Sequence, residues 1–320
     1  MRLRFSRLLS ILVVKKTDLA VSLVRDRGFR VSHVAEAFDI SRSNLYERLN
    51  KPQQQERKER PKLKDSEILP LIIEIVDERP TYGYRRVQYL INRRLATEGK
   101  QLVNHKTVYR IMKENNLLLK APCKRNVPNT HTGKIVCEES DQRWCSDGFE
   151  VKCNNGEKVR TIFVMDCCDR EIISFTMSRG GYTSEMAQLV LVDAVEKRFG
   201  TDHVKEAIEW LTDNGSCFIS KDTKQVVNEL GMKNCYTPVR SPESNGMAEA
   251  FVKTIKRDYV SINELVNAQT VMESMKKWIE DYNEIAPHKG LGGMSPRIFR
   301  RQRCPLNGNF PGAARLKEAA

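Results

Sequence analysis

The sequence predicts an α/β domain with a mixed β-sheet, preceded by two all-α units. Up to about residue 118 the apolar residues follow the spacing of helices, whereas from residue 142 the spacing becomes strand-like. Three strand patterns come first and are followed by alternating helix and strand patterns, which is typical of a mixed sheet covered by helices. The chain has 320 residues, which is enough for two or three domains.

The chain is strongly basic, with a net charge of +13 and a pI of about 9.3. Each basic side chain placed on a phosphate releases a counterion, so this surplus favours a nucleic acid as partner. A solubility charge or an acidic membrane surface would produce the same total. Hydrophobic residues make up 40% of the chain, which indicates a folded globular protein rather than a disordered one.

The nine cysteines form no CxxC pair and show no disulfide-like spacing, which indicates a reduced, intracellular protein and argues against a zinc site. The apolar stretch Leu8–Val14 is too short to cross a bilayer. Lys15, Lys16 and Asp18 follow it without a small-residue cleavage site, so it does not match a signal peptide either. We therefore expect no membrane partner.

Residues 1–50 are predicted to form a first helix-turn-helix unit. Ser32 is a candidate N-cap for a helix with Val34 and Ala35 on its inner face, and a turn at 39–41 precedes a second helix. In this motif the second helix enters the major groove of DNA. The residues expected to contact DNA are Arg42, Asn44 and Arg48. A plain helical hairpin has the same periodicity, and the polar segment 51–66 is expected to be a linker.

Residues 67–120 are predicted to form a second helix-turn-helix unit. Its first helix should end at Arg79, because the residue before a proline avoids the helical region. Tyr82–Arg86 opens the next helix, and Asn104 is placed to cap the last one. The residues expected to contact DNA are Arg85, Arg86, Lys106, Tyr109 and Arg110. A helical spacer between domains would give the same pattern, and residues 121–140 are expected to form a second linker.

The catalytic domain is expected at 141–285, followed by a C-terminal tail at 286–320. Its predicted strands and helices are Gln142–Lys152, Lys158–Asp166, Ile172–Met177, the helix Ser184–Phe199, the strand Ala207–Thr212, a helix at 221–230, a strand at 233–238, and helices at 246–259 and 262–283.

Three acids stand at the edges of these elements. Asp147 lies within the first predicted strand, and Asp213 closes the short strand predicted at 207–212. Glu249 lies one turn into a helix that starts at Asn245-Gly246. Carboxylates gathered at one edge repel each other, and divalent cations remove that repulsion. Two Mg²⁺ or Mn²⁺ ions held this way can activate an attacking oxygen and stabilise a leaving one, which is what in-line phosphodiester chemistry requires. We therefore predict Asp147, Asp213 and Glu249 as catalytic metal ligands.

The sequence around these acids resembles the DDE transposases and retroviral-type integrases, and most closely the OrfB-type transposases of bacterial insertion sequences. The resemblance covers about residues 67–302. The segments that carry it are Gln142–Asp147, Asp166–Arg170, Trp210–Ser216, Ser241–Phe251, Tyr82–Arg86, Tyr282-Asn283, Pro287-His288 and Ser295-Pro296. The resemblance implies an RNase H-like catalytic core behind helix-turn-helix DNA-binding domains, and catalysis of DNA cleavage and strand transfer.

The resemblance further implies that water attacks the phosphodiester at an element end and that the released 3′-hydroxyl attacks a second one. The expected substrates are the terminal inverted repeats of the element and target DNA, bound by a homo-oligomer in the bacterial cytoplasm at the nucleoid. An upstream OrfA-type partner or fusion is also expected, because this chain shows no heptad run. Lys253 and Lys256 follow Glu249 on the same helix face, where they could hold DNA phosphates.

Some residues near these segments receive plainer interpretations. Asp166 and Asp169 are expected to close a hairpin, and Trp278 and Tyr282 to belong to the core. His288 could contact DNA or cap a turn. The chain departs from its relatives at 288–293, where glycines replace an aromatic residue and could loosen the C-terminal packing.

Three other functions remain open on the sequence. An RNase H-type nuclease would share the acids and metals without needing two upstream DNA-binding units. A DNA-binding regulator derived from a decayed transposase would not require all three acids. An accessory protein could act only when joined to its upstream partner.

Overall fold

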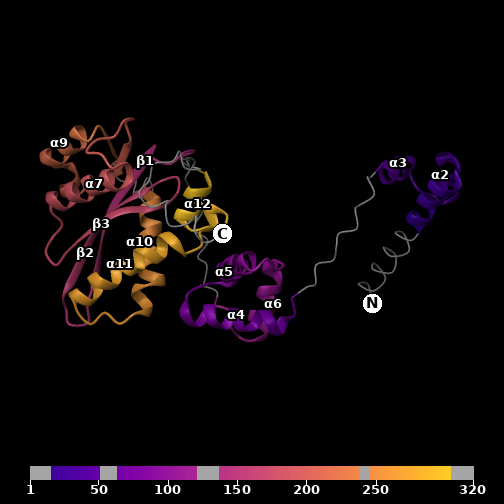
Figure 1. Cartoon of the computed structure of the whole chain (residues 1–320), viewed down its shortest axis with the longest axis horizontal. Coiled ribbons are helices and arrows are strands. Elements are labelled where there is room, and N and C mark those ends of the chain that lie inside the picture. Colours follow the sequence, from indigo (N-terminus) through magenta and orange to yellow (C-terminus); the bar gives the residue numbers. More distant parts are fainter. Residues whose placement is uncertain (1–15, 51–62, 121–136, 238–244, 304–320) are drawn as a thin grey trace. The chain divides into compact units, whose positions relative to one another are not determined.

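The computed structural model describes residues 16–50, 63–120, 137–237 and 245–303. The chain divides into two compact units, 1–62 and 63–320, both drawn in Figure 1.

The first unit contains a helix at 16–27 followed by α2 (Val31–Ala37) and α3 (Arg42–Asn50). Val34 and Leu45 are fully buried in its small core. The turn between α2 and α3 contains Asp39 with φ of 48°, and the Ser41 hydroxyl accepts the backbone N–H of Asn44. The two predicted helices and the turn between them are present, although α2 begins one residue before Ser32 and has no side-chain cap.

In the second unit, α4 (Asp65–Glu78), α5 (Tyr84–Thr97) and α6 (His105–Glu114) pack around a shared apolar core. Helix α4 ends where the Arg79-Pro80 pair predicts. The Asn104 side chain caps α6 by accepting the backbone N–H of Lys106 at 2.9 Å. The helices predicted here are therefore present, with their apolar stripes facing one another.

The rest of the second unit contains a mixed five-stranded sheet in the order β3-β2-β1-β4-β5 among the described residues. Strands β1, β2 and β3 form an antiparallel meander, and β4 and β5 add parallel to the other edge of β1. The strands are β1 (Arg143–Lys152), β2 (Lys158–Asp166), β3 (Ile172–Ser178), β4 (Glu209–Thr212) and β5 (Lys233–Tyr236). The mixed sheet predicted from the sequence is confirmed.

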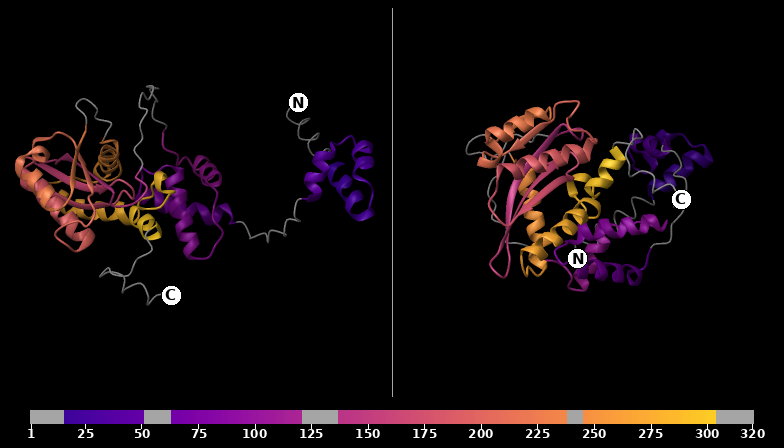
Figure 2. Two further views of the ribbon diagram at one scale, coloured as in Figure 1. Left: turned by 90° about the horizontal axis from the view of Figure 1, so that it is seen from above. Right: turned by 60° about the vertical axis from the view of Figure 1, so that its left-hand side comes forward.

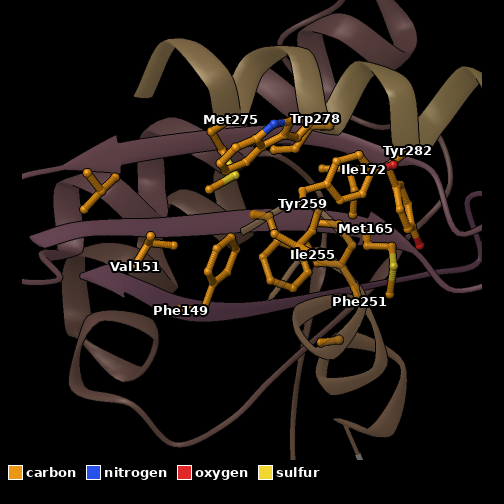
Figure 3. Close-up of a cluster of buried hydrophobic side chains, with 14 of the residues drawn as sticks. Phe149, Val151, Met165, Ile172, Phe251, Ile255, Tyr259, Met275, Trp278 and Tyr282 are labelled. Carbon is orange, nitrogen blue, oxygen red and sulfur yellow. The ribbon is translucent and has the colours of Figure 1, made fainter. Parts of the chain in front are cut away.

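Helices cover both faces of this sheet, so the domain has three layers (Figure 2). β1 is the central strand of the middle layer. On one face lie α7 (Ser184–Phe199), α8 (Ser216–Ile219) and α9 (Lys221–Glu229). On the other lie α10 (Gly246–Asp258), the short 3-10 helix η2 (Val260–Ile262) and α11 (Ala268–Glu284). Figure 3 shows the second core, in which Phe149 of β1, Phe251 of α10 and Tyr282 of α11 meet.

Residues 286–303, which were expected from the sequence to belong to a C-terminal tail, contain two short helices, and the second of them packs on the core. The 3-10 helix η3 (Lys289–Leu291) is followed by α12 (Pro296–Arg303), which packs against α11. Arg297 of α12 forms ion pairs with Glu171 and Glu284 at 2.8 and 3.1 Å. Helix α12 was not predicted from the sequence. Its arginines resemble those of an exposed segment, and periodicity does not indicate that their partners include Glu171, far away in the sequence.

The hairpin between β2 and β3 is anchored by a buried ion network. Arg198, at the C-terminal end of α7, is 2% exposed and pairs with Asp141, Asp169 and Glu171. The carboxylate of Asp166 accepts the backbone N–H groups of the turn. The hairpin role expected for Asp166 and Asp169 therefore agrees with the structure.

Candidate active site

The register of β1 and β4 brings two of the predicted acids together. The strands run parallel, with Cys145 opposite Leu211. Two residues further along each strand are Asp147 and Asp213, and side chains two residues apart point to the same face of a sheet. Cys145 and Leu211 face the layer that contains α10. Both aspartates therefore stand side by side on the α10 side, Asp147 within β1 and Asp213 just after β4.

The third acid is brought to this place by the start of α10. Ala248, Phe251 and Ile255 are buried against the sheet, which fixes the rotation of the helix. The buried side chain of Asn245 donates from Nδ2 to the Ser146 carbonyl at 3.0 Å, next to Asp147. This bond ties the first turn of α10, where Glu249 lies, to the strand that carries the first acid.

The pKa of Asp147 shows that the three carboxylates share one electrostatic environment. Burial is the main cause that raises this pKa to about 6, and the negative charges of Asp213 and Glu249 raise it further. The Gly148 N–H and the charge of Lys256 oppose the shift. Burial and two neighbouring carboxylates disfavour the charged form of such a carboxyl. A bound cation favours the charged form, so the carboxyl is a suitable cation ligand.

The donor set fits a hard divalent cation. The backbone N–H of Gly148 donates to Asp147 Oδ1 at 2.7 Å, and that of Gly215 donates to Asp213 Oδ1 at 3.0 Å. Each contact orients one carboxylate and leaves the second oxygen for other partners. Oxygen-only ligands suit Mg²⁺ and Mn²⁺.

Glu249 does not lie in a metal-binding arrangement as the side chains stand. Its Oε2 accepts from Lys253 Nζ at 3.0 Å. Among the residues that the structure describes, no three His, Cys, Asp or Glu side chains are already arranged to hold an ion. The contact with Lys253 leaves Oε1 of Glu249 for other partners, and an exposed ion pair of this kind is worth little, so Lys253 does not prevent Glu249 from binding a metal.

Comparison with known proteins gives the family. Two models of an integrase core domain match residues 138–242 and 230–296, and an HTH-like domain model matches residues 62–126. The transposase InsD for insertion element IS2-9 of Escherichia coli K12 is 45% identical over 291 residues, which cover 90% of this chain and 94% of that protein. The InsD transposase of element IS2D is also 45% identical, over 288 residues covering 89% and 95%. The chain belongs to the insertion-element transposases.

More distant likenesses are to solved catalytic cores. The BIV integrase core is 15% identical with a TM-score of 0.36, covering 51% of this chain and 95% of that one. The catalytic domain of Mos1 mariner transposase is 11% identical with a TM-score of 0.39, covering 50% and 74%.

The transposase is thus an enzyme of the DDE polynucleotidyl transferase class, with an integrase-type catalytic core preceded by an HTH-like domain, as predicted. No helix within the described part of the chain is long and apolar enough to span a membrane.

The predicted DNA-contact residues of the first unit differ in availability. Arg42 and Asn44 are exposed near the start of α3. Arg48 is half-buried and pairs with Asp18 at 3.2 Å, so it also holds α3 against the helix at 16–27.

In the second unit, Arg85, Lys106 and Tyr109 are exposed. Tyr84 packs edge-on against Tyr109, with ring centroids 5.1 Å apart, and the Arg85 guanidinium lies 5.5 Å from the Tyr84 ring. The surface formed by α5 and α6 therefore carries aromatic rings and basic side chains next to each other.

Arg110 and Arg86 have partners within the protein. Arg110 is exposed but pairs with Asp65 and Glu114, so a DNA contact would compete with both. Arg86 points toward the catalytic core, where it pairs with Asp258 at 2.6 Å. The DNA contact expected for Arg86 from the sequence would therefore compete with this ion pair, and Asp258 also pairs with Arg257 at 2.7 Å.

Lys253 and Lys256 are exposed on α10, on the face of Glu249. Tyr182 was not predicted from the sequence. A Cβ built on Gly148 would lie 2.9 Å from its ring, and the charge of Asp147 is one of the causes that raise the pKa of Tyr182. Its position just before α7 carries no motif, so only the fold brings it beside the first acid.

The glycines at 288–293 tighten the packing rather than loosening it, which corrects the expectation from the sequence. Gly293 has φ of +87°, and a Cβ there would lie 2.2 Å from the Tyr89 ring of α5. Gly290 allows a similar approach by Arg170. His288 packs edge-on against Tyr282, and burial lowers its pKa to about 3, so the ring is neutral.

Proposed function

We propose that Asp147, Asp213 and Glu249 are the catalytic metal ligands of this transposase, and that it acts on the ends of its insertion element and on target DNA. The observation that carries the proposal is the β1–β4 register, which sets Asp147 beside Asp213 on the side of α10. Burial is the main cause of the raised pKa of Asp147, and the charges of Asp213 and Glu249, which raise it further, support the same grouping.

When bound, two divalent cations, Mg²⁺ or Mn²⁺, would supply Lewis-acid activation of the attacking oxygen and stabilisation of the leaving oxygen. The three carboxylates would hold them, and Asn245 would keep the first turn of α10 beside β1. Lys253 and Lys256 would bind phosphates flanking the reacting bond, because both are exposed on the Glu249 face.

The reaction has two stages. Water attacks the phosphodiester at an element end and releases a 3′-hydroxyl, and that hydroxyl then attacks a second phosphodiester. Each stage forms one P–O bond and breaks another on the opposite side of the phosphorus, so the same acids serve both without a covalent intermediate on the protein.

The proposed DNA contacts are Arg42, Asn44 and Arg48 in the first unit, and Arg85, Lys106, Tyr109 and Arg110 in the second. Paired element ends require a homo-oligomer on DNA, and an upstream OrfA-type partner or fusion would complete end recognition. We place the reaction in the bacterial cytoplasm at the nucleoid. We also propose functional segments at 1–50, 67–120 and 141–285, joined by linkers at 51–66 and 121–140, with the core extended to 303.

The test is to incubate the transposase with labelled DNA that carries the terminal repeats of its element, with Mg²⁺, beside Asp213→Asn and Asp222→Asn. Both aspartates are exposed, but Asp222 lies in α9, away from the other acids. We expect cleavage and strand joining by wild type and Asp222→Asn, and DNA binding without chemistry by Asp213→Asn. Binding without chemistry in all three would instead favour a regulator or an accessory protein, and cleavage without joining would favour a nuclease.

A further inference from the structure

Side chains in and beside the turn between α4 and α5 bind the second helical domain to the catalytic core. We call these contacts, made by Arg79, Thr81 and Arg86 with Asp258 and Asp281, the clamp. Arg79 donates through both terminal nitrogens to the two carboxylate oxygens of Asp281 on α11, at 2.7 and 2.6 Å. The Tyr259 hydroxyl donates to the same carboxylate at 2.7 Å. Paired, two-pronged contacts of this kind fix orientation as well as distance.

A second acid completes the clamp. The Asp258 side chain is only 1% exposed and accepts from Arg86 at 2.6 Å and from the Thr81 hydroxyl at 2.7 Å. The Tyr82 side chain lies between the two clamp arginines, with the Arg86 guanidinium 3.5 Å from its ring centroid and that of Arg79 at 5.4 Å. Asp258 also pairs with Arg257 of its own helix at 2.7 Å. The side chains of Arg79, Arg86 and Asp281 are 15%, 20% and 22% exposed. Buried and partly buried charges are costly without partners, and in the docked arrangement all four are paired.

The clamp acts on the helix that carries a catalytic acid. Asp258 is the last residue of α10 and Glu249 lies in its first turn. These two positions are nine residues apart in the sequence, which corresponds to about 14 Å along a helix axis. Because Ala248 and Ile255 are buried against the sheet, α10 has a fixed place in the core. One rigid helix therefore connects the docked domain to the acidic site.

The clamp also connects to the exposed surface proposed to contact DNA. Arg86 belongs to the first turn of α5, and α5 and α6 share an apolar core that includes Val87 and Val108. The exposed side chains Lys106 and Tyr109 of α6 consequently keep a fixed position relative to Glu249.

We infer that Arg79, Arg86, Asp258 and Asp281 are positioning residues that hold the DNA-contacting surface of α6 at a fixed distance from the three acids, so that docking determines which phosphodiester of a bound element end is cut. This inference rests on the proposed function, since it concerns where on the DNA that reaction occurs. The Tyr82–Arg86 segment is thereby assigned to docking. Of the two arginines in this segment, Arg85 is exposed and Arg86 is partly buried.

The experiment compares the wild-type chain with Arg79→Asp, Asp281→Arg and the double charge swap. The matched control is Arg94→Ala, because Arg94 lies on the same helical domain but pairs with Glu74 inside it. Hydrogen exchange is measured by mass spectrometry on the peptides 79–86 and 252–259. The products on labelled element-end DNA are mapped to the nucleotide, with hydroxyl-radical footprinting of bound DNA in parallel.

We expect each single charge reversal to speed exchange in both peptides and to spread cleavage over neighbouring nucleotides, so that the fraction at the wild-type position falls several-fold. The double swap should restore both the exchange and the single cleavage position, whereas Arg94→Ala should match wild type throughout. A simple loss of stability would lower the yield of product without moving the cut, and it would not be rescued by the swap.

Unchanged exchange in the single variants would overturn the docking role. Faster exchange with cleavage and footprint still at the wild-type position would overturn the positioning role. If the wild-type chain neither cuts nor protects element-end DNA, the proposed function fails and the positioning role fails with it, while the exchange data still report whether the clamp exists.

Discussion

At the residue scale, Asp147 links pH, metal binding and stability. Its pKa of about 6 lies above the ordinary value of 3.8, so the folded state favours the protonated carboxyl. That stabilisation is complete below pH 3.8 and is lost as pH rises through 6. At neutral pH and without metal, the charged carboxylate therefore lowers stability, by at most about 2 kcal/mol after allowing for its partial exposure to solvent.

We accordingly expect Asp147→Asn to raise the melting temperature at pH 7 in EDTA, and the gain to vanish near pH 4. Mg²⁺ should raise the melting temperature of the wild type at pH 7 but much less at pH 5, and should not stabilise the variant. Thermal unfolding followed by circular dichroism measures both effects, with Asp222→Asn as control. Equal stabilisation of wild type and Asp147→Asn by Mg²⁺ would show that the ion binds elsewhere.

At the element scale, the glycines after α11 permit a close contact that a side chain would block. Gly293→Ala would place a Cβ 2.2 Å from the Tyr89 ring and strain a backbone at φ of +87°. We expect a loss of about 1–3 kcal/mol in the free energy of unfolding, by both mechanisms. Gly292→Ala is the matched control, because its φ is also positive at +65° but the nearest atom is 3.9 Å away.

Urea unfolding of both variants, alone and combined with Tyr89→Ala, measures this difference. Removing the Tyr89 ring should relieve the steric part of the Gly293→Ala penalty and leave Gly292→Ala unaffected. Equal penalties in the two glycine variants, whether or not Tyr89 is present, would mean that backbone strain alone is responsible.

The same elements show what a sequence can predict. The bounds of α7 and β2 were predicted to the residue. Asp147, Asp213 and Glu249 could be picked out because they lie within a strand, just after a strand and in the first turn of a helix. The ion pair of Arg86 could not be predicted, because periodicity indicates which side of a helix is buried but not what covers the other side. Its partner, Asp258, is 172 residues away, and Tyr182 was missed because only the fold brings it beside Gly148.

At the scale of the whole molecule, α12 completes the charge balance of the core. Four carboxylates, those of Asp141, Asp166, Asp169 and Glu171, face Arg198 inside the protein. Arg297 and Arg300 of α12 approach the same acids from outside. A chain ending at 285 would leave one arginine against four acids and would lose the ring contact of His288 with Tyr282.

We therefore expect a chain truncated after residue 285 to lose at least about 3–5 kcal/mol, the usual effect of removing one partner of a buried ion pair. Because domains are typically stable by only about 5–15 kcal/mol, this loss should leave much of the core unfolded at 37 °C. A chain truncated after residue 303 is the control and should melt like the full chain. Calorimetry and near-ultraviolet circular dichroism distinguish the two. If the shorter chain melts at the same temperature as the control, then Arg198 alone suffices for the acids, and the core ends at α11.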